Sequence, residues 1–462
     1  MDIRLLSAVA ASHASAAVIR RLGHGGGTAL PGLVANWIDP RALAKLSAQL
    51  PHGVIVVSGT NGKTTTARAI ATIAAAAGYR PVHNRSGSNL VRGVTAAVAA
   101  QTRLNGRVCG DLGIFEADEA AFPAIVAQTR PRLVVLLNLF RDQLDRYGEL
   151  DAIARRWSQA LALLPPDSCV LVNADDPTLA VMTETLPVPR ITFGILEAEE
   201  QLPSLPHAAD ALSCRRCGAA LTYRQAFLSH LGEYVCPRCG FTRPRLDYGA
   251  SEIVLEGLDR LQLRLTIPQG DQIPLAVPLG GLYNAYNVIA AAAAAHTFGI
   301  TPSAIAQGFA QMTAAFGRLE RVCYHGREII FLLIKNPTGL NEVVRALAKS
   351  PEAPLFFAIN DLDADGRDIS WLWDADLEPL AAWHTSFFTG GLRGPDMALR
   401  LKYAGIAETR VHELGRLPEA FERFVARLAP GARGYVLPTY TALLSLRRYL
   451  AARGAAPAFW EQ

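Results

Sequence analysis

Short apolar runs alternate with helix-like stretches over the first 200 residues of the chain. Val54 to Val57 is the first such run, and residues 132–138 and 168–173 form later ones. Stretches such as the alanine-rich segment from Ala67 to Ala77 separate them. Apolar, β-branched runs of this length are typical of strands that are buried on both faces of a parallel sheet. The pattern therefore predicts a doubly wound α/β core.

The pattern changes after residue 200 and again near residue 322. Alternating runs at 261–267 and 273–277 indicate antiparallel strands, and a glycine turn at 280 leads into an alanine-rich helix. A second set of strands and helices follows, which predicts a C-terminal Rossmann-like α/β domain. We expect an N-terminal helical segment at 1–50, a central domain at 51–320 with an insert at about 205–247, and the C-terminal domain at 321–462.

A glycine-rich turn lies between the first strand and the first helix of the central domain. It reads Gly59-Thr60-Asn61-Gly62-Lys63-Thr64-Thr65. Its small residues let backbone N–H groups surround an anion at the positive end of the helix. Lys63 can reach the β- and γ-phosphates of a nucleotide, and the Thr64 hydroxyl can ligate Mg²⁺. Val57 stands where the usual pattern has its first glycine, but the strand–turn–helix context predicts a phosphate-binding loop.

Two carboxylates follow the strand in GDLGIFEADEA. Glu116 and Asp118 stand at its carboxyl end, beside the predicted phosphate loop. A Mg²⁺ ligand belongs at this edge of a parallel sheet, and Glu116 is our candidate. The alternative is a solvated acidic turn.

Two further segments carry candidate nucleotide-binding residues. Asn284 and Asn287 stand on the first turn of the helix that begins after Gly280, where amides can cap the helix or face a ligand. Arg318 lies in FGRLERV, at the end of the central domain.

Four of the seven cysteines form a metal-binding pattern. They are Cys214, Cys217, Cys236 and Cys239, two C-x-x-C pairs that are each followed by glycine. This spacing predicts a zinc ribbon. Four thiolates leave no coordination position for water, so the predicted role of the zinc is structural.

Composition narrows the function classes. The net charge of +4 over 462 residues is too small to argue for nucleic-acid binding. The sequence has no apolar run of 18 residues and no clear signal peptide, which predicts a cytoplasmic protein without a transmembrane segment.

The acidic loop NDLDADGRDIS follows a predicted strand at 354–359. Asp361, Asp365 and Asp368 lie at the sheet edge where ligands and partners gather. The loop imitates a calcium-binding EF-hand, but Leu372 stands where the twelfth position requires glutamate. A self-capping acidic turn is the alternative.

Several motifs in this order resemble the Mur ligase family, which joins amino acids to carboxylates through an acyl phosphate. The matching stretches are GTNGKTTT, EAD, NLFRDQLDRYGE, NADDP, YNAYN, FGRLER and DADGRDIS. The inserted ribbon, KNPTGLNEV and LPTYTALL resemble the branch that amidates lipid II. The resemblance implies ATP and Mg²⁺ as cofactors, a GatD-type glutaminase partner, and lipid II as substrate at the inner membrane face. It also implies that this chain lends an aspartate to the glutaminase, with Asp361 our first choice and Asp365 our second.

The chain also departs from the amino-acid-adding members of the family. Those enzymes carry histidine where this chain has Gln143, and soon afterwards a carbamylated lysine that holds a second Mg²⁺. Here no lysine lies between Lys63 and Lys335, so another arrangement would have to hold that ion. The alternative functions are an amino-acid-adding ligase of the Mur or folylpolyglutamate synthase type, and a non-catalytic ATP-dependent zinc-ribbon binding module.

Overall fold

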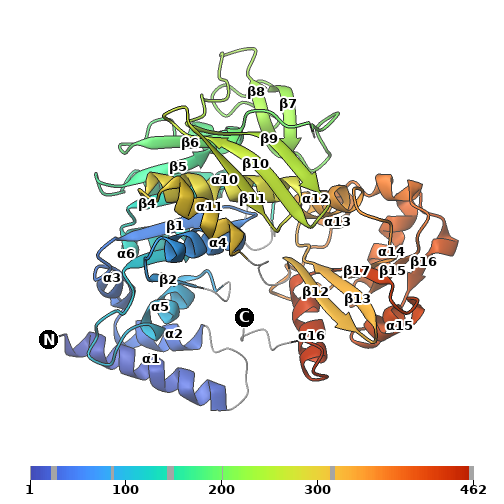
Figure 1. Cartoon of the computed structure of the whole chain (residues 1–462), viewed down its shortest axis with the longest axis horizontal. Coiled ribbons are helices and arrows are strands. Elements are labelled where there is room, and N and C mark those ends of the chain that lie inside the picture. Colours follow the sequence, from blue (N-terminus) through green and yellow to red (C-terminus); the bar gives the residue numbers. More distant parts are fainter. Residues whose placement is uncertain are drawn as a thin grey trace.

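Two α/β units lie side by side and meet near the middle of the molecule (Figure 1). The structure, a computed structural model, describes residues 2–21, 29–84, 88–142, 150–199, 201–312 and 318–456, without the side chain of Arg318. Gln143 and the sequence HGGGT at 24–28, where we expect a glycine turn between two N-terminal helices, lie outside these residues. Each unit is built around one sheet. The predicted α/β fold is confirmed.

The larger sheet has nine strands in the order β11-β10-β9-β6-β5-β4-β1-β3-β2. Its parallel part comprises β1 (Val54–Ser58), β2 (Pro81–His83), β3 (Leu112–Glu116), β4 (Leu133–Leu136), β5 (Cys169–Asn173) and β6 (Arg190–Ile195). An antiparallel extension comprises β9 (Tyr248–Glu256), β10 (Arg260–Thr266) and β11 (Gln272–Val277). The sheet is continuous because β6 pairs with β9 in parallel.

Alternate residues of β1 enter two different hydrophobic cores. Ile55 and Val57 pack in the core on one face, and Val54 and Val56 in the core on the other. Because side chains alternate along a strand, an uninterrupted apolar run is what a doubly covered strand requires. The first face is covered by α4 (Lys63–Ala76), α10 (Leu282–Thr297) and α11 (Pro302–Ala310). The second is covered by α3 (Ala42–Ser47), α5 (Val91–Ala100), α6 (Phe122–Thr129), α8 (Leu150–Leu161) and α9 (Pro177–Met182).

The second sheet has six strands in the order β12-β13-β17-β14-β15-β16. They are β12 (Arg318–Tyr324), β13 (Arg327–Leu332), β14 (Leu355–Ala358), β15 (Phe387–Gly390), β16 (Val411–Glu413) and β17 (Arg433–Pro438). Only β12 runs antiparallel to its neighbour. Its helices are α12 (Pro337–Leu347), α13 (Trp371–Asp374), α14 (Gly394–Tyr403), α15 (Glu419–Arg427) and α16 (Tyr440–Ala451), with short 3₁₀ turns at Glu378–Ala382 and Glu408–Arg410. The segment around Arg318, which we placed at the end of the central domain, thus pairs within this second sheet.

A two-stranded hairpin rises from the central unit between β6 and β9 (Figure 1). Its strands are β7 (Thr222–Leu228) and β8 (Leu231–Val235), which pair in antiparallel fashion. The predicted cysteine pairs flank it, one before β7 and one directly after β8.

The chain begins with a helical segment. Helix α1 (Ile3–Arg21) packs against α2 (Leu30–Ile38), and both contact α5. Among the described residues, no helix combines the length and the apolarity that crossing a bilayer requires.

Candidate active site

The predicted phosphate loop follows β1, the strand at which the order of the sheet reverses. β1 lies between β3 and β4, and β2 lies at the sheet edge beyond β3. In doubly wound sheets, ligands bind outside the carboxyl ends of the strands at such a point. The loop at residues 59–62 therefore occupies the position where the topology favours a ligand.

Close packing holds the loop in one conformation. Gly59 and Gly62 have φ angles of 148° and 90°, which favour glycine. A Cβ atom at Gly62 would lie 2.0 Å from the Asn287 side-chain oxygen. The Asn61 N–H donates to Asn138 Oδ1 at 2.8 Å, and the Asn138 amide donates back to the Asn61 carbonyl at 3.0 Å. No side chain caps the start of α4, so its first N–H groups are available to an anion.

Lys63 is the buried cation of the site. Its side chain is only 8% exposed and pairs with Glu119 at 2.9 Å. The Lys63 ammonium also donates to the carbonyls of Gly59 and Thr60. Burial opposes the charge of Lys63, but Glu119, Asp118 and Glu116 together raise its pKa above the ordinary lysine value. Burial likewise opposes the charge of Glu119, and Lys63 and Lys335 lower its pKa.

Glu116 is placed beside the phosphate loop by the register of β1 and β3. It pairs with Val57, two residues before Gly59. Two amides hold it: Asn84 bonds both its backbone N–H and its carbonyl, and Asn89 donates to its carboxylate at 3.3 Å. Carboxylate oxygens such as those of Glu116 are ligands that a hard cation takes. At the start of α4, the buried Thr65 hydroxyl has no hydrogen-bond partner among the described residues.

The two asparagines of α10 differ in their surroundings. Asn284 donates to the Gly280 carbonyl at 2.7 Å, and Asn287 donates to Asn284 at 3.1 Å. The Asn287 oxygen accepts from Thr66 and touches the phosphate loop at Gly62. Asn287 thus lies at the site, whereas Asn284 supports it from behind. The side chain of Arg318 lies outside the described residues.

The second unit completes the site with two adjacent residues that precede α12. Lys335 forms an ion pair with the buried carboxylate of Asp142, beyond β4. Asn336 caps α12 through Gly339 N–H and donates to Asn61 Oδ1 at 3.1 Å. Burial raises the pKa of Asp142 despite the opposing charge of Lys335. The C-terminal unit is therefore in direct contact with the phosphate loop.

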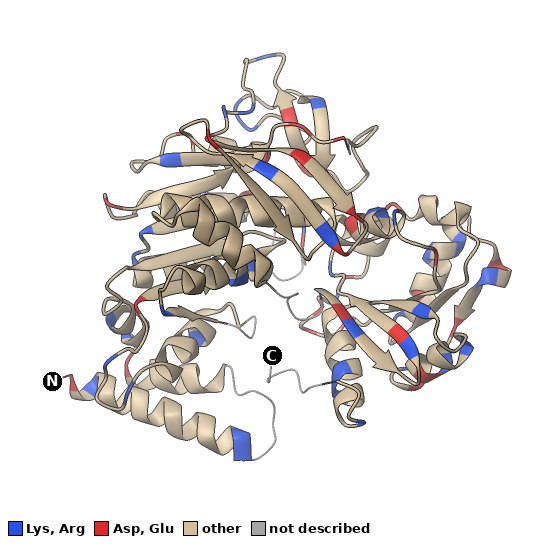
Figure 2. Cartoon of the chain, viewed as in Figure 1, with Lys and Arg blue, Asp and Glu red and all other residues tan. Residues whose placement is uncertain are grey.

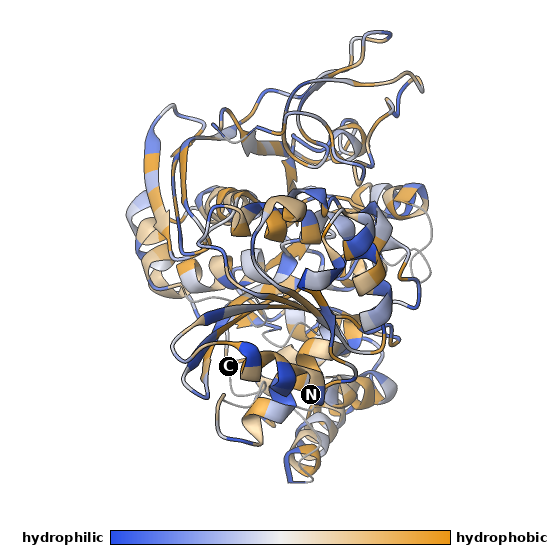
Figure 3. Cartoon of the chain, turned by 90° about the vertical axis from the view of Figure 1, so that its right-hand side faces the viewer, coloured by the Kyte–Doolittle hydropathy of each residue, from blue (hydrophilic) through white to orange (hydrophobic). Residues whose placement is uncertain are grey.

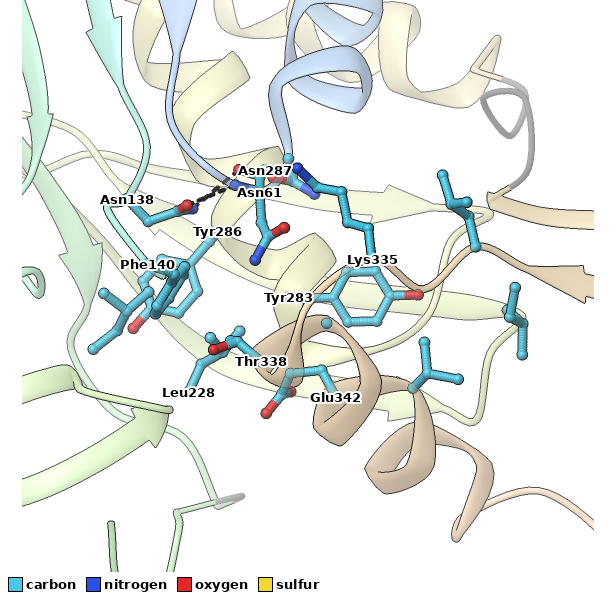
Figure 4. Close-up of a pocket in the computed structure, with 16 residues that line it drawn as sticks. Asn61, Asn138, Phe140, Leu228, Tyr283, Tyr286, Asn287, Lys335, Thr338 and Glu342 are labelled. Atoms are coloured by element: carbon cyan, nitrogen blue, oxygen red, sulfur yellow. Dashed lines mark hydrogen bonds between the residues drawn. The ribbon is translucent and has the colours of Figure 1, made fainter. Parts of the chain in front are cut away.

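A cavity of about 790 Å³ opens between the two units at this point. Figure 4 shows Asn61, Asn287 and Lys335 at one side of it, and Phe140, Tyr283 and Tyr286 around it. Its other lining residues are Gly62, Asn138, Leu228, Leu231, Leu332, Leu333, Thr338, Gly339, Glu342 and Val343. The mix of aromatic and amide side chains suits a nucleoside beside the phosphate loop.

The four cysteines form a second candidate site, far along the hairpin from the cavity. Their sulfur atoms all lie within 4.8 Å of one another, and two pairs are 3.6 and 3.5 Å apart. Tetrahedral zinc with bonds of about 2.3 Å requires sulfur atoms roughly 3.8 Å apart. Gly218 and Gly240, at φ of 76° and 74°, close two equivalent turns, each donating its N–H to the first cysteine of its pair. The cluster therefore fits one Zn²⁺ ion.

The three aspartates of the 361–368 loop have separate partners. Asp361 accepts from Arg393 Nε and Nη2 at 2.8 and 2.7 Å. Asp365 accepts from the backbone and hydroxyl of Thr441, and burial raises its pKa. Asp368 caps the turn at Ser370. Of the three, Asp365 has the contacts of a structural turn residue.

Three residues of the site were not among our candidates: Glu119, Asp142 and Lys335. Glu119 ends EADE, whose earlier carboxylates drew our attention, and Asp142 precedes Gln143 in FRDQLDRYG. Lys335 is one of only five lysines, and that scarcity is the one signal that could have singled it out.

The two sheets and the phosphate loop have the arrangement of the Mur ligase fold. The family model described as Mur ligase middle domain matches residues 57–210. A pseudomurein peptide ligase type C from Methanothermus fervidus superposes with a TM-score of 0.67 over 88% of this chain and 80% of that chain, at 19% identity. This likeness concerns the fold.

Relatives that match this chain over nearly its full length identify the family more narrowly than the fold does. The lipid II isoglutaminyl synthase (glutamine-hydrolyzing) subunit MurT of Streptococcus pneumoniae is 32% identical over 98% of both chains. The protein of that name from Staphylococcus aureus is 29% identical over 92% of this chain and 93% of its own. The model described as MurT ligase C-terminal matches residues 333–443. The chain belongs to the MurT family, and the resemblance found in the sequence is confirmed.

Proposed function

We propose that the chain is the ligase subunit of an enzyme that amidates the D-glutamate α-carboxyl of the lipid II stem peptide to D-isoglutamine. The names of the relatives support this substrate and product. One structural observation carries the proposal. The buried Lys63 lies under a phosphate loop that is completed by Lys335 and Asn336, at the start of the segment that matches the MurT C-terminal model.

ATP and Mg²⁺ fit the site. The uncapped start of α4 and Lys63 would hold the phosphates, together with Gly59, Thr60, Asn61, Gly62 and Thr65, and the adjoining cavity would hold the nucleoside. Thr64 and Glu116 are the proposed ligands of Mg²⁺, which would neutralise charge on the phosphates. Asn61 in the loop and Asn287 beside it both line the cavity and would orient the nucleotide.

The reaction requires an activated carboxylate, because ammonia cannot displace oxide. A carboxylate oxygen of D-glutamate attacks the γ-phosphorus of ATP, and the bond to ADP breaks. Ammonia then attacks the carbonyl carbon of the acyl phosphate through a tetrahedral intermediate. Inorganic phosphate leaves, and one proton is lost from nitrogen. Lys63 and Lys335 supply fixed positive charge where negative charge gathers during phosphoryl transfer.

Ammonia would come from a GatD-type glutaminase bound to the C-terminal unit. The C-terminal unit exposes the apolar side chains of Leu362 in the 361–368 loop and of Leu392, whose N–H donates to Asn360 just before the loop. It also exposes Trp373 and Tyr403, which contact each other. Exposed apolar side chains that gather on one part of a surface can form a protein interface. Asp361 is the proposed residue that this chain lends to the glutaminase, where it would orient a catalytic histidine.

The test is amidation of lipid II by the purified chain with and without a co-expressed glutaminase. We expect ATP-dependent amidation with ammonium for the chain alone, and with glutamine only for the complex. Incorporation of a free amino acid in place of ammonia would instead establish an amino-acid-adding ligase. Binding of ATP and nucleic acid without any ligation would overturn both the amidating and the amino-acid-adding ligase.

A further inference from the structure

The N-terminal helices expose large apolar side chains that the ligase site does not use. Ile3 and Val18 of α1 are 76% and 55% exposed, and Leu30 and Trp37 of α2 are 49% and 78% exposed. Arg4 Nε, at the start of α1, donates to the carbonyl of Ile38, at the end of α2. The two helices run antiparallel (Figure 1), so Ile3 and Trp37 each neighbour a residue of this contact, whereas Val18 lies toward the far end of α1 and Leu30 begins α2. We call these four side chains the hairpin surface, after the helical hairpin formed by α1 and α2, which is distinct from the β7–β8 hairpin.

Basic residues outnumber acidic residues in the N-terminal helical segment at 1–50. Arg20 and Arg21 end α1, and all four arginines of the segment are exposed: Arg4, Arg20, Arg21 and Arg41. Blue residues mark the end of α1 in Figure 2. The segment contains only two acidic residues, Asp2 and Asp39, and both pair with Lys45. Both acidic side chains of this segment are thus paired, and basic side chains border the hairpin surface among its described residues.

The hairpin surface is one helix layer away from the ligase site. Helix α2 packs closely on α5, since a Cβ atom at Gly32 would lie 1.7 Å from the Arg92 carbonyl oxygen. Asn89, just before α5, donates to the Glu116 carboxylate. In the view of Figure 3, the first helix lies at one end of the molecule, with apolar and polar positions intermixed along it.

We propose that the hairpin surface docks the protein on an anionic lipid bilayer. Tryptophan is favoured at the boundary between lipid headgroups and acyl chains, and arginines gain from the negative surface potential. A second copy of the chain is a poorer occupant, because it would bring the same arginines together. The inference deepens the proposed function, since the proposed substrate is itself a lipid, and α5 would then hold Glu116 close to the membrane.

The experiment is co-sedimentation of the full chain with vesicles, without ATP or substrate. Vesicles of phosphatidylcholine with 30% phosphatidylglycerol (about one-third anionic) are compared with pure phosphatidylcholine. We expect binding to the anionic vesicles that weakens in 0.5 M salt, where the Debye length is about half its value at physiological ionic strength. Trp37→Ser should weaken partitioning roughly tenfold, and the pair Arg20→Gln/Arg21→Gln roughly fivefold per arginine.

Matched controls use equally exposed residues elsewhere. Leu163→Ser, at an 83% exposed leucine after α8, and Arg155→Gln/Arg156→Gln, a tandem exposed pair on α8, should bind as the wild type does. Circular dichroism and retained ammonium-driven amidation with a soluble substrate analogue exclude misfolding. Equal binding by the wild type and Trp37→Ser, no binding to anionic vesicles, or a Trp37-dependent dimer would each overturn the proposal. Because the assay contains no substrate, its failure is distinct from failure of the amidation test.

Discussion

Lys63 and Glu119 form an ion pair that is almost completely removed from water, at 8% and 3% exposure. Loss of one partner of a buried pair leaves an uncompensated charge, which typically costs about 3–5 kcal/mol. Lys63→Ala therefore has two expected effects, on catalysis and on stability.

We expect Lys63→Ala to reduce ATP turnover by at least about a hundredfold, because its charge acts on the transferring phosphoryl group. The double variant Lys63→Ala/Glu119→Gln removes the stranded charge and should regain stability without regaining turnover. Lys402→Ala, which removes an exposed lysine of α14, is the control. Ordinary turnover in folded Lys63→Ala protein would exclude this loop from phosphate binding.

The stability cost of Lys63→Ala should depend on pH. In the wild type, the lowered pKa of Glu119 gives stability above its unfolded pKa, and this is lost as pH falls through the folded value. Without Lys63, Lys335 and a backbone hydrogen bond still oppose the effect of burial, but the largest opposing charge is gone, so the pKa of Glu119 should rise and stability should fall as pH rises above the unfolded value. The penalty should grow by about 1.4 kcal/mol per pH unit until the carboxyl is ionised. Urea unfolding at pH 5 and pH 8 measures this; an equal penalty at both values would contradict it.

Glu116→Gln tests the proposed metal ligand. The change keeps the size of the side chain and its contact with Asn89 but removes the charge. We expect the Mg²⁺ concentration for half-maximal turnover to rise on the order of tenfold. Glu408→Gln, at an exposed glutamate paired with Lys402, is the matched control. An unchanged Mg²⁺ dependence would remove Glu116 from the site.

At this scale, the sequence predicts residues whose role follows from local context. Lys63 follows a strand and opens a helix, so its position could be inferred from neighbouring residues alone. Glu119 and Lys335 could not be inferred in this way, because their contacts depend on how β3 and the second unit pack against the loop. Asp142 is similar, since its partner stands 193 residues further on.

At the scale of elements, the hairpin β7–β8 links the zinc site to the cavity. The cysteine pairs flank its open end, whereas Leu228 and Leu231 at its turn line the cavity. His230, between them, is fully buried and lies 4.8 Å from the ring of Phe140. Arg345 of α12 also donates to the Phe227 carbonyl at 2.6 Å. The hairpin is thus placed to hold one wall of the cavity.

We predict one zinc ion per chain, and a cost in nucleotide binding when it is lost. Cys236→Ser should release the metal and lower stability, because metal binding and local folding are coupled. It should also raise the KM for ATP several-fold by loosening the wall formed by Leu228 and Leu231. Elemental analysis and ATP titration measure these effects, with Cys109→Ser, at an exposed cysteine outside the cluster, as control. Substoichiometric zinc in fresh wild-type protein would contradict the predicted zinc site. An unchanged KM for ATP in Cys236→Ser would contradict the predicted link between the zinc site and the cavity wall.

The elements that the sequence predicted are those with strong local patterns. The uninterrupted apolar runs became β1, β4 and β5, and the alanine run at Ala290–Ala295 became part of the buried helix α10. β6, β9 and β12 were not predicted as members of their sheets, since their pairing is set by distant strands. In β9 a bulge opposite β10 further interrupts the pairing register.

At the scale of the whole molecule, the two units are joined by polar contacts around the site. Asn61–Asn336 and Lys335–Asp142 meet at the phosphate loop, and His207–Asp376 and Arg141–Asp374 lie further out. Asp376 raises the pKa of His207. The junction is therefore hydrogen-bonded and charged beside the cavity, as in an interface that can open and close around a ligand.

The last prediction concerns the proposed partner and separates the two halves of the reaction. Asp361 is held by two hydrogen bonds from Arg393 and lies among exposed apolar side chains of the C-terminal unit. A carboxylate that orients a catalytic histidine affects only the reaction of that histidine. Asp361→Asn should therefore reduce glutamine-driven amidation at least about a hundredfold and leave ammonium-driven amidation intact.

Asp363→Asn is the matched control, because Asp363 lies in the same loop but is 89% exposed and paired with Arg367. It should leave both nitrogen sources effective. Equal loss with glutamine and ammonium in Asp361→Asn would place Asp361 in the ligase site instead. If Asp361→Asn loses neither glutamine-driven nor ammonium-driven amidation, Asp361 and Arg393 only stabilise the turn. A carboxylate that the partner needs cannot be replaced by an amide without slowing glutamine hydrolysis.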